Sequence, residues 1–180
     1  HKMSLVDDPT RAFRIARFAA RLGFTPTADT QESLSLARGL GAFERLGGER
    51  LLRELLLIAQ EPEPGHVLAH CSANGLLNLV SPALRWDADA RRCLDRFFHG
   101  IRQGGLGALE GLVDPALVML MLLARGASRG QRAALTTRLK MTGRPAALLN
   151  DFAEQLRALT GKLLHQPRAG RLTRLCEEAG

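Results

Sequence analysis

Two side chains with complementary hydrogen-bonding chemistry lie near the amino terminus: Asp8 and Arg11, three residues apart in Asp7-Asp8-Pro9-Thr10-Arg11. At the start of a helix this spacing places them on neighbouring faces. A carboxylate accepts hydrogen bonds, and a guanidinium donates several in one plane. The pair therefore complements the base-pairing edge of cytosine or adenine, which carries an amino donor beside a ring-nitrogen acceptor. Uracil and guanine present a carbonyl and a ring N–H instead. A helix cap with a local ion pair is the alternative interpretation.

A second group of possible ligands is His66, His70 and Cys71. A helix would place the two imidazoles on one side, because they are four residues apart. Zinc requires three or four ligands, and no second cluster in the sequence supplies the others. Ordinary packing or surface histidines explain the spacing, so we predict no metal site.

Asp87 and Asp89 have the spacing of the carboxylate pair that holds metal ions in phosphoryl-transfer enzymes. They follow Trp86 and precede a predicted helix, with no glycine-rich phosphate loop nearby; the glycines at 104–107 indicate a connector. Helix capping and compensation of the helix dipole explain the pair. No serine or cysteine lies in a nucleophile-elbow pattern. The sequence therefore predicts no catalytic residue.

The elements that position these residues are predicted to be helices. Of the 180 residues, 46% are hydrophobic and 4% aromatic. The hydrophobic content excludes disordered and collagen-like chains, and the shortage of aromatics disfavours a sheet-rich fold. No segment alternates apolar and polar residues with a period of two. We predict an all-α fold with helices over 8–23, 30–41, 49–58, 66–71, 76–80, 87–104, 117–124, 128–140 and 144–160, and a last helix after Pro167.

The clearest break in the helical pattern is the segment Glu61-Pro62-Glu63-Pro64-Gly65. Proline and glycine in this density interrupt a helix. We therefore divide the chain into two parts, 1–61 and 62–180.

Positive charge is concentrated in the second part. The chain has a net charge of +7. The segment from Arg125 to Arg174 contains eleven basic residues and only two acidic ones, Asp151 and Glu154. Such a cluster favours a polyanion such as RNA, although each residue taken singly is also typical of a solvated helix face. The predicted RNA-binding residues are Arg125, Arg129, Arg132, Arg138, Lys140 and Arg144.

The cysteines and the apolar segments bear on the compartment. Cys71, Cys93 and Cys176 show no Cys-x-x-Cys spacing, which is typical of a reducing cytoplasm. No apolar run approaches the roughly 20 residues that a bilayer requires. We expect a cytoplasmic protein without a membrane segment.

The run from Ser4 to Phe18, followed by Leu22-Gly23-Phe24, resembles the neck of class II tRNA nucleotidyltransferases, the CCA-adding, A-adding and poly(A) polymerase-like enzymes. Thr30 and then Glu49-Arg50 with Glu54-Leu55 follow in the order that this resemblance implies. It covers residues 4–61, about a third of the chain. The remaining helices are similar to the body and tail of the family only in class and in basic character.

The resemblance implies that Asp8 and Arg11 form an amino-acid template that selects incoming CTP or ATP. It places Arg14 and Arg17 near the nucleotide or its phosphates, and it implies that Thr30, Glu49 and Arg50 brace the nucleotide-binding helix. Residues 1–61 would be the neck, and residues 62–180 the body and tail that hold the acceptor arm of tRNA. Asp7 stands where the family usually has glutamate.

The family's catalytic head carries an Asp-x-Asp pair, which holds Mg²⁺, and a phosphate-contacting loop; it precedes the neck. Only seven residues precede Asp8 here. We therefore expect a chain with no cofactor of its own, which transfers no nucleotide alone and whose partners are the head, tRNA, and ATP or CTP. The alternatives are a stand-alone helical RNA-binding module and a protein-interaction scaffold that exposes an apolar helix over 117–123.

Overall fold

All the regular structure is helical in the computed structural model, which describes residues 3–103 and 114–164, with side chains up to residue 155. The predicted all-α class is confirmed. The expected helix after Pro167, the connector at 104–107 and Cys176 lie outside the described residues. The helices are α1 (Ser4–Asp7), α2 (Thr10–Leu22), α3 (Ala28–Gly39), α4 (Gly48–Ala59), α5 (Pro64–Ala73), α6 (Leu76–Val80), α7 (Ala88–Arg102), α8 (Pro115–Leu123), α9 (Arg129–Arg138) and α10 (Gly143–Leu164).

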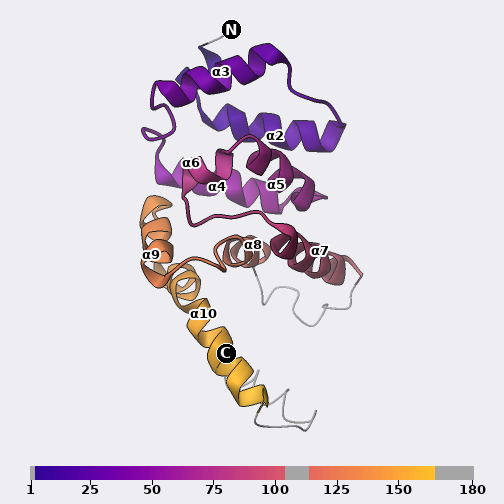
Figure 1. Ribbon diagram of the computed structural model, residues 1–180, viewed down its shortest axis with the longest axis vertical. Coiled ribbons are helices and arrows are strands. Elements are labelled where there is room, and N and C mark those ends of the chain that lie inside the picture. Colours follow the sequence, from indigo (N-terminus) through magenta and orange to yellow (C-terminus); the bar gives the residue numbers. More distant parts are fainter. Residues whose placement is uncertain (1–2, 104–113, 165–180) are drawn as a thin grey trace.

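The helices form an elongated stack (Figure 1). Helices α1 to α3 lie at one end, α4 to α6 in the middle, and α7 to α9 beyond them, while α10 projects away from the other end. Helix α2 packs on α4 and α5, and α4 also packs on α8. The helix α4 therefore lies at the centre of the stack and contacts both of its halves.

Local sequence signals set most of the helix boundaries. Asp87 accepts hydrogen bonds from the backbone at the start of α7, Asp114 does so for α8, and Ser128 forms a capping box with Gln131 at the start of α9. These side chains pair the amides that the first turn of a helix leaves without partners. The helix starts that the sequence predicted at Asp87 and Ser128 are confirmed, whereas α8 begins at Pro115, before the predicted start at 117.

The sequence predicted that Thr30 begins its helix, but the helix begins earlier, at Ala28. The N-cap is Thr27, whose hydroxyl accepts from the Thr30 amide at 3.4 Å, so Thr30 is the third residue of α3. The short helix α1 was not expected at all. It is a single turn in which the Met3 carbonyl accepts from the amides of Val6 and Asp7.

One continuous apolar cluster runs through the stack from Leu5 to Leu149. Pro64 begins α5 at its first position, where proline costs no hydrogen bond. The cluster crosses this break, because Leu55 and Ile58 before it belong to the same cluster as Val67 after it.

Helix α8 contributes to the same core. Met119, Leu120 and Leu123 are buried, and none of the large hydrophobic residues of α8 is exposed. The exposed apolar patch that the interaction-scaffold alternative offered at 117–123 is therefore not present. Leucine-rich helices pack inward when neighbouring helices surround them.

Candidate functional site

Asp8 lies in the turn between α1 and α2, and its two carboxylate oxygens have different surroundings. Oδ1 accepts from the Thr10 amide at 3.3 Å, from the Thr10 hydroxyl at 2.7 Å and from Nη2 of Arg50 at 2.7 Å. Oδ2 lies 3.8 Å from Nε of Arg11 and accepts no hydrogen bond from the described residues. The carboxylate is thus held through one oxygen and presents the other.

The protonation state of Asp8 follows from this arrangement. Burial by itself raises the pKa of the carboxyl, but the hydrogen bonds from Thr10 and the charge and hydrogen bond of Arg50 outweigh it, so the pKa lies below its ordinary value. At neutral pH the group is ionised and can only accept hydrogen bonds.

Arg11 extends beside Asp8 with about half of its side chain exposed. Its Nη1 donates to the Ser4 hydroxyl at 2.5 Å. The short helix α1 therefore fixes one edge of the guanidinium. The sequence spacing predicted that Asp8 and Arg11 would be neighbours, and the structure has them so; the role of Ser4 could not be foreseen without α1.

A pocket of about 620 Å³ opens between α1, α2 and α3. Arg11 and Arg14 supply cationic groups, Ile15 and Phe18 an apolar wall, and Thr30 and Ser33 hydroxyls. Arg11, Arg14 and Phe18 belong to the same face of α2, since they recur at intervals of three and four residues. The pocket combines two cations, one carboxylate (Asp29) and an apolar wall beside the Asp8–Arg11 pair.

Arg17 does not share this face, contrary to the expectation that it lies near a nucleotide. Its Nη1 donates to Oε1 of Glu61 at 3.3 Å, its Nη2 lies 3.8 Å from Oε2 of Glu54, and only 16% of the side chain is exposed. The helical spacing places Arg17 on the side of α2 that packs against α4, so its charge serves the internal contact.

Glu54 is the buried member of that internal contact. Burial raises its pKa above the ordinary value, against the lowering effect of the charges of Arg17 and Arg14. Glu54 and Glu61, neither of them predicted as site residues, hold α2 against α4 and the turn that follows α4.

The predicted bracing residues divide between two places. Arg50 contacts Asp8, while Glu49 points to the opposite end of the stack and meets Nζ of Lys140 at 3.4 Å. Glu49 does not brace α2, because adjacent residues of a helix face different directions.

Of the six predicted RNA-binding cations, Arg132 is internal. Its side chain is 2% exposed; it donates to the carbonyls of Asn150 at 2.8 Å and Ala127 at 2.7 Å and pairs with Glu154 at 2.8 Å. The guanidinium also lies over the Phe152 ring, 5.1 Å from its centre. An RNA phosphate cannot reach this group, and the RNA-binding prediction for Arg132 was wrong.

Arg138 is also engaged internally. Its Nη1 donates to the Leu46 carbonyl at 2.8 Å and its Nη2 to the Phe43 carbonyl at 2.9 Å. The turn before α4 occupies the fork that would bind a phosphate, which argues against an RNA contact by Arg138.

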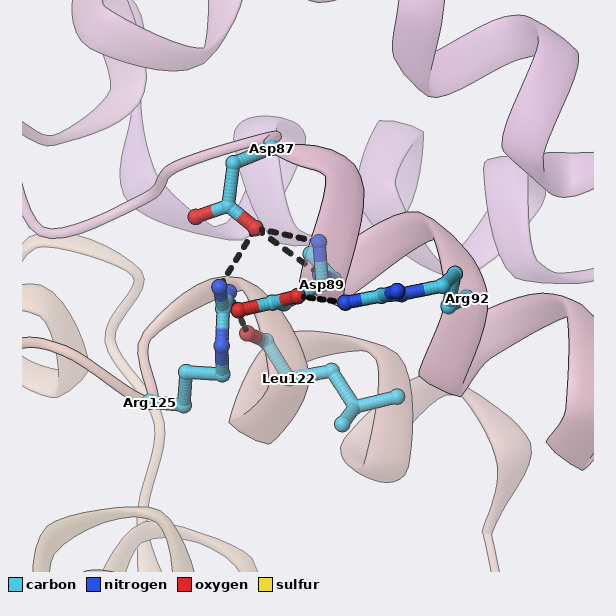
Figure 2. A network of polar contacts seen from close by, with 6 residues as sticks. Asp87, Asp89, Arg92, Leu122 and Arg125 are labelled. Carbon is cyan, nitrogen blue, oxygen red and sulfur yellow. Dashed lines mark hydrogen bonds and ion pairs between the residues drawn. The ribbon is translucent and has the colours of Figure 1, made fainter.

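The other four cations are more accessible. Arg129 is 71% exposed and pairs with Asp151 at 3.0 Å, and Lys140 pairs with Glu49. Arg144 is exposed and has no ion pair with a described residue. Arg125 pairs with Asp87 and donates to the Leu122 carbonyl at 3.2 Å (Figure 2).

The carboxylate pair on α7 is committed to protein contacts (Figure 2). Asp87 accepts from the amides of Asp89 at 3.0 Å and Ala90 at 2.9 Å, and Asp89 pairs with Arg92. The hydrogen bond from the Ala90 amide and the bond from Arg125 lower the pKa of Asp87. The capping interpretation of Asp87 is confirmed.

Among the residues that the structure describes, no three metal-ligating side chains come together. His66 is exposed, His70 is half-buried, and burial raises the pKa of the Cys71 thiol to about 12. These donors do not fit a Mg²⁺ or zinc site. Within the described ranges no helix has the length and apolar character needed to cross a bilayer.

Comparison with known proteins gives consistent matches in sequence and in fold, although no family model matches the chain. It is 41% identical over 95 residues to the A-adding tRNA nucleotidyltransferase of Geobacter sulfurreducens, a match that covers 53% of this chain and 11% of that protein. It is 35% identical over 153 residues to the CCA-adding enzyme of Pseudomonas putida, covering 72% of this chain and 40% of that protein.

Solved structures share the helical arrangement. A tRNA-processing enzyme in its apo form superposes with a TM-score of 0.79 at 20% identity, over 99% of this chain and 48% of that one. A tRNA nucleotidyltransferase complexed with a primer tRNA and an incoming ATP analogue gives 0.75 at 21% identity, over 99% of this chain and 52% of that one. The chain thus spans about half of these proteins and less of the curated relatives. Because the sequence matches carry the assignment and the fold agrees with it, the chain belongs to the tRNA nucleotidyltransferase family.

Proposed function

We propose that Asp8 and Arg11 read the base of an incoming ATP or CTP during the addition of nucleotides to a tRNA 3′ end. The relatives are named for A-adding and CCA-adding activity, and a solved structure with the same fold contains CTP. The proposal leaves the transfer step to a catalytic head of the whole protein, since no metal centre lies among the described residues.

The observation that carries this proposal is the unequal use of the two Asp8 oxygens. Thr10 and Arg50 hold Oδ1, so Oδ2 is fixed in direction and available to accept from the amino group of adenine or cytosine. Arg11, 3.8 Å away, donates to the adjacent ring nitrogen. Uracil or guanine would place a carbonyl against the carboxylate and an N–H against the guanidinium, which leaves both pairs unmatched.

The phosphates of the nucleotide and the tRNA are assigned to two different parts of the stack. Arg14 lies in the same pocket and is exposed, so we assign it to the phosphates of the nucleotide. We assign tRNA contacts to the accessible cations Arg129, Lys140 and Arg144. With Arg132 and Arg138 committed internally, the RNA surface is smaller than the sequence alone indicated.

The test is the base preference of the 180-residue chain, measured by NMR chemical-shift titration with ATP, CTP, UTP and GTP. We expect ATP and CTP to bind roughly 5- to 100-fold more tightly than UTP and GTP, the range for one mismatched pair of hydrogen-bonding groups. Asp8→Asn keeps the shape, replaces an acceptor with a donor and should abolish the preference.

The matched control is Arg53→Ala, which removes an exposed cation from the same helix as Arg50 without touching Asp8. It should leave the order of affinities unchanged. Equal binding of all four nucleotides, before and after Asp8→Asn, would remove the base-reading role. A helical RNA-binding module would then be the better description.

A further inference from the structure

The position of Asp8 depends on contacts that begin at the other half of the stack. Arg50, which holds Asp8, is the third residue of α4, and α4 begins at Gly48 directly after the turn over 40–47. A guanidinium can hold a carboxylate in a fixed place only if its own helix start is fixed. Contacts that fix the start of α4 therefore help to position Asp8 and Arg11, the proposed base-reading pair.

Arg138, at the last turn of α9, fixes this turn. Its two terminal nitrogens donate to the carbonyls of Leu46 and Phe43, at 2.8 and 2.9 Å, across more than 90 residues of sequence. The planar fork joins two points of one turn in a fixed geometry, which the rotatable donors of an ammonium do not impose. The guanidinium restricts the direction in which α4 leaves the turn.

Gly48 shows how closely the two helices meet. A Cβ at this position would overlap the carbonyl oxygen of Arg138 and lie 3.0 Å from its carbon and 3.1 Å from the carbon of Leu139. Only a residue without a side chain allows this approach. The end of α9 thus contacts the first residue of α4 through backbone as well as through the Arg138 side chain.

We infer that Arg138 is a positioning residue: by fixing the turn before α4, it holds Arg50 against Asp8 and couples the far half of the stack to the base-reading pair. The effect on base reading rests on the proposed function, whereas the positioning of Arg50 and Asp8 rests on the contacts described above. The neighbouring contact between Lys140 and Glu49 is exposed on both sides and contributes little to this coupling.

The mechanism can be tested without nucleotide, by carbon-13 NMR titration of the Asp8 carboxyl in the 180-residue chain. The charged groups facing this carboxyl are Arg11 from α2 and Arg50 and Glu54 from α4. Arg50→Ala should raise the pKa of Asp8 by the full contribution of that guanidinium. Arg138→Ala and Arg138→Lys should both raise it part of the way. Because lysine keeps the charge but loses the fork, a shift in Arg138→Lys reports geometry and not charge.

Two further variants make the titration decisive. Gly48→Ala, which disturbs the same junction from the other side, should shift the Asp8 titration in the same direction. Arg144→Ala removes an exposed cation from α10 and should leave it unchanged. If Arg138→Lys unfolds at a lower temperature while the Asp8 titration stays as in the parent chain, Arg138 stabilises the fold only and the inference is overturned.

The functional consequence has its own readout. In the nucleotide titrations described above, Arg138→Lys should reduce the preference for ATP and CTP over UTP and GTP at least threefold. An unchanged preference would overturn the coupling to base reading. If the parent chain itself shows no preference, the proposed function fails, while the Asp8 titration still decides whether Arg138 positions that carboxylate.

Discussion

Helices α2 and α9 are both rich in arginine, yet they use it differently. On α2, Arg11 and Arg14 line an open pocket, Arg17 turns inward to Glu54 and Glu61, and the half-exposed Arg21 also reaches Glu61, at 4.0 Å. On α9, Arg132 and Arg138 donate to backbone carbonyls of neighbouring segments, and only Arg129 extends into solvent.

The difference follows from what surrounds each helix. Helix α9 adjoins α10 and the turn before α4, and carbonyls of these segments and of Ala127 accept hydrogen bonds from its arginines. A guanidinium with five donors supplies several such bonds at once. Helix α2 has the open pocket on one side, so two of its arginines have no internal carbonyls to pair. A cluster of basic residues in a sequence therefore indicates a ligand surface only where neighbouring segments leave the donors unused.

The largest effect is expected within α9 itself. Arg132→Ala would remove the donor to the carbonyls of Ala127 and Asn150 and the ion pair with Glu154, and would leave a cavity in place of a buried side chain. We expect the free energy of unfolding to fall by about 2–4 kcal/mol, for the lost hydrogen bonds and the cavity, measured by urea denaturation. Arg129→Ala, in the same helix but exposed, should change it by less than about 0.5 kcal/mol. Similar values for the two variants would contradict the division between internal and outward arginines.

The second effect tests how closely α9 meets α4. Gly48→Ala inserts a methyl group against the backbone of Arg138, and overpacking of this kind costs about 1–3 kcal/mol. We expect a lower melting temperature by circular dichroism. Gly39→Ala is the control, because a Cβ there meets no atom within 4 Å and alanine favours the helix. An unchanged melting temperature for Gly48→Ala would show that the two helices are separated further.

The sequence predicted the contacts between residues close together in the chain, but not those between distant residues. The caps at Asp87 and Ser128, and the closeness of Asp8 to Arg11, involve residues at most three positions apart. Local patterns predicted them correctly because the interacting groups belong to one turn of helix.

The roles of Arg132 and Arg138 depend on contacts that no local pattern contains. Arg132 reaches residues 18 and 22 positions away, and Arg138 reaches residues more than 90 positions away. Arg50 contacts Asp8, 42 positions away. Only the family resemblance pointed to this contact, by implying that Arg50 braces the nucleotide-binding helix. Charge alone could not separate these arginines from exposed ones such as Arg144.

The third effect concerns the inward side of α2. Since burial raises the pKa of Glu54, the folded state binds this proton more tightly than the unfolded chain. The contribution of Glu54 to stability is therefore fully present below the ordinary glutamate pKa and is lost as pH rises through the raised folded value. Glu54→Gln should increase stability at pH 7 by up to about 1 kcal/mol and flatten the profile above pH 4.5, measured by thermal denaturation across pH.

The pH profile of the same experiment separates Glu54 from Asp8, whose pKa is shifted in the opposite direction. Asp8 contributes stability that is present above its ordinary pKa and lost as pH falls through the lowered folded value. Asp8→Asn should therefore remove stability near neutral pH. Equal responses of the two variants would contradict the contrast between the inward and outward sides of α2.

The smallest effect is expected for the exposed cations of α9 and α10, such as Arg144. Arg144→Ala should weaken tRNA binding only about two- to threefold, but it should reduce the slope of log affinity against log salt by roughly one, as expected when one phosphate contact is lost. Fluorescence anisotropy with labelled tRNA over a series of salt concentrations measures both quantities. Arg138→Lys should leave the slope unchanged, because its guanidinium is bound to carbonyls and releases no counterion from RNA. A reduced slope for Arg138→Lys with an unchanged one for Arg144→Ala would reverse the assignment and return Arg138 to the RNA surface.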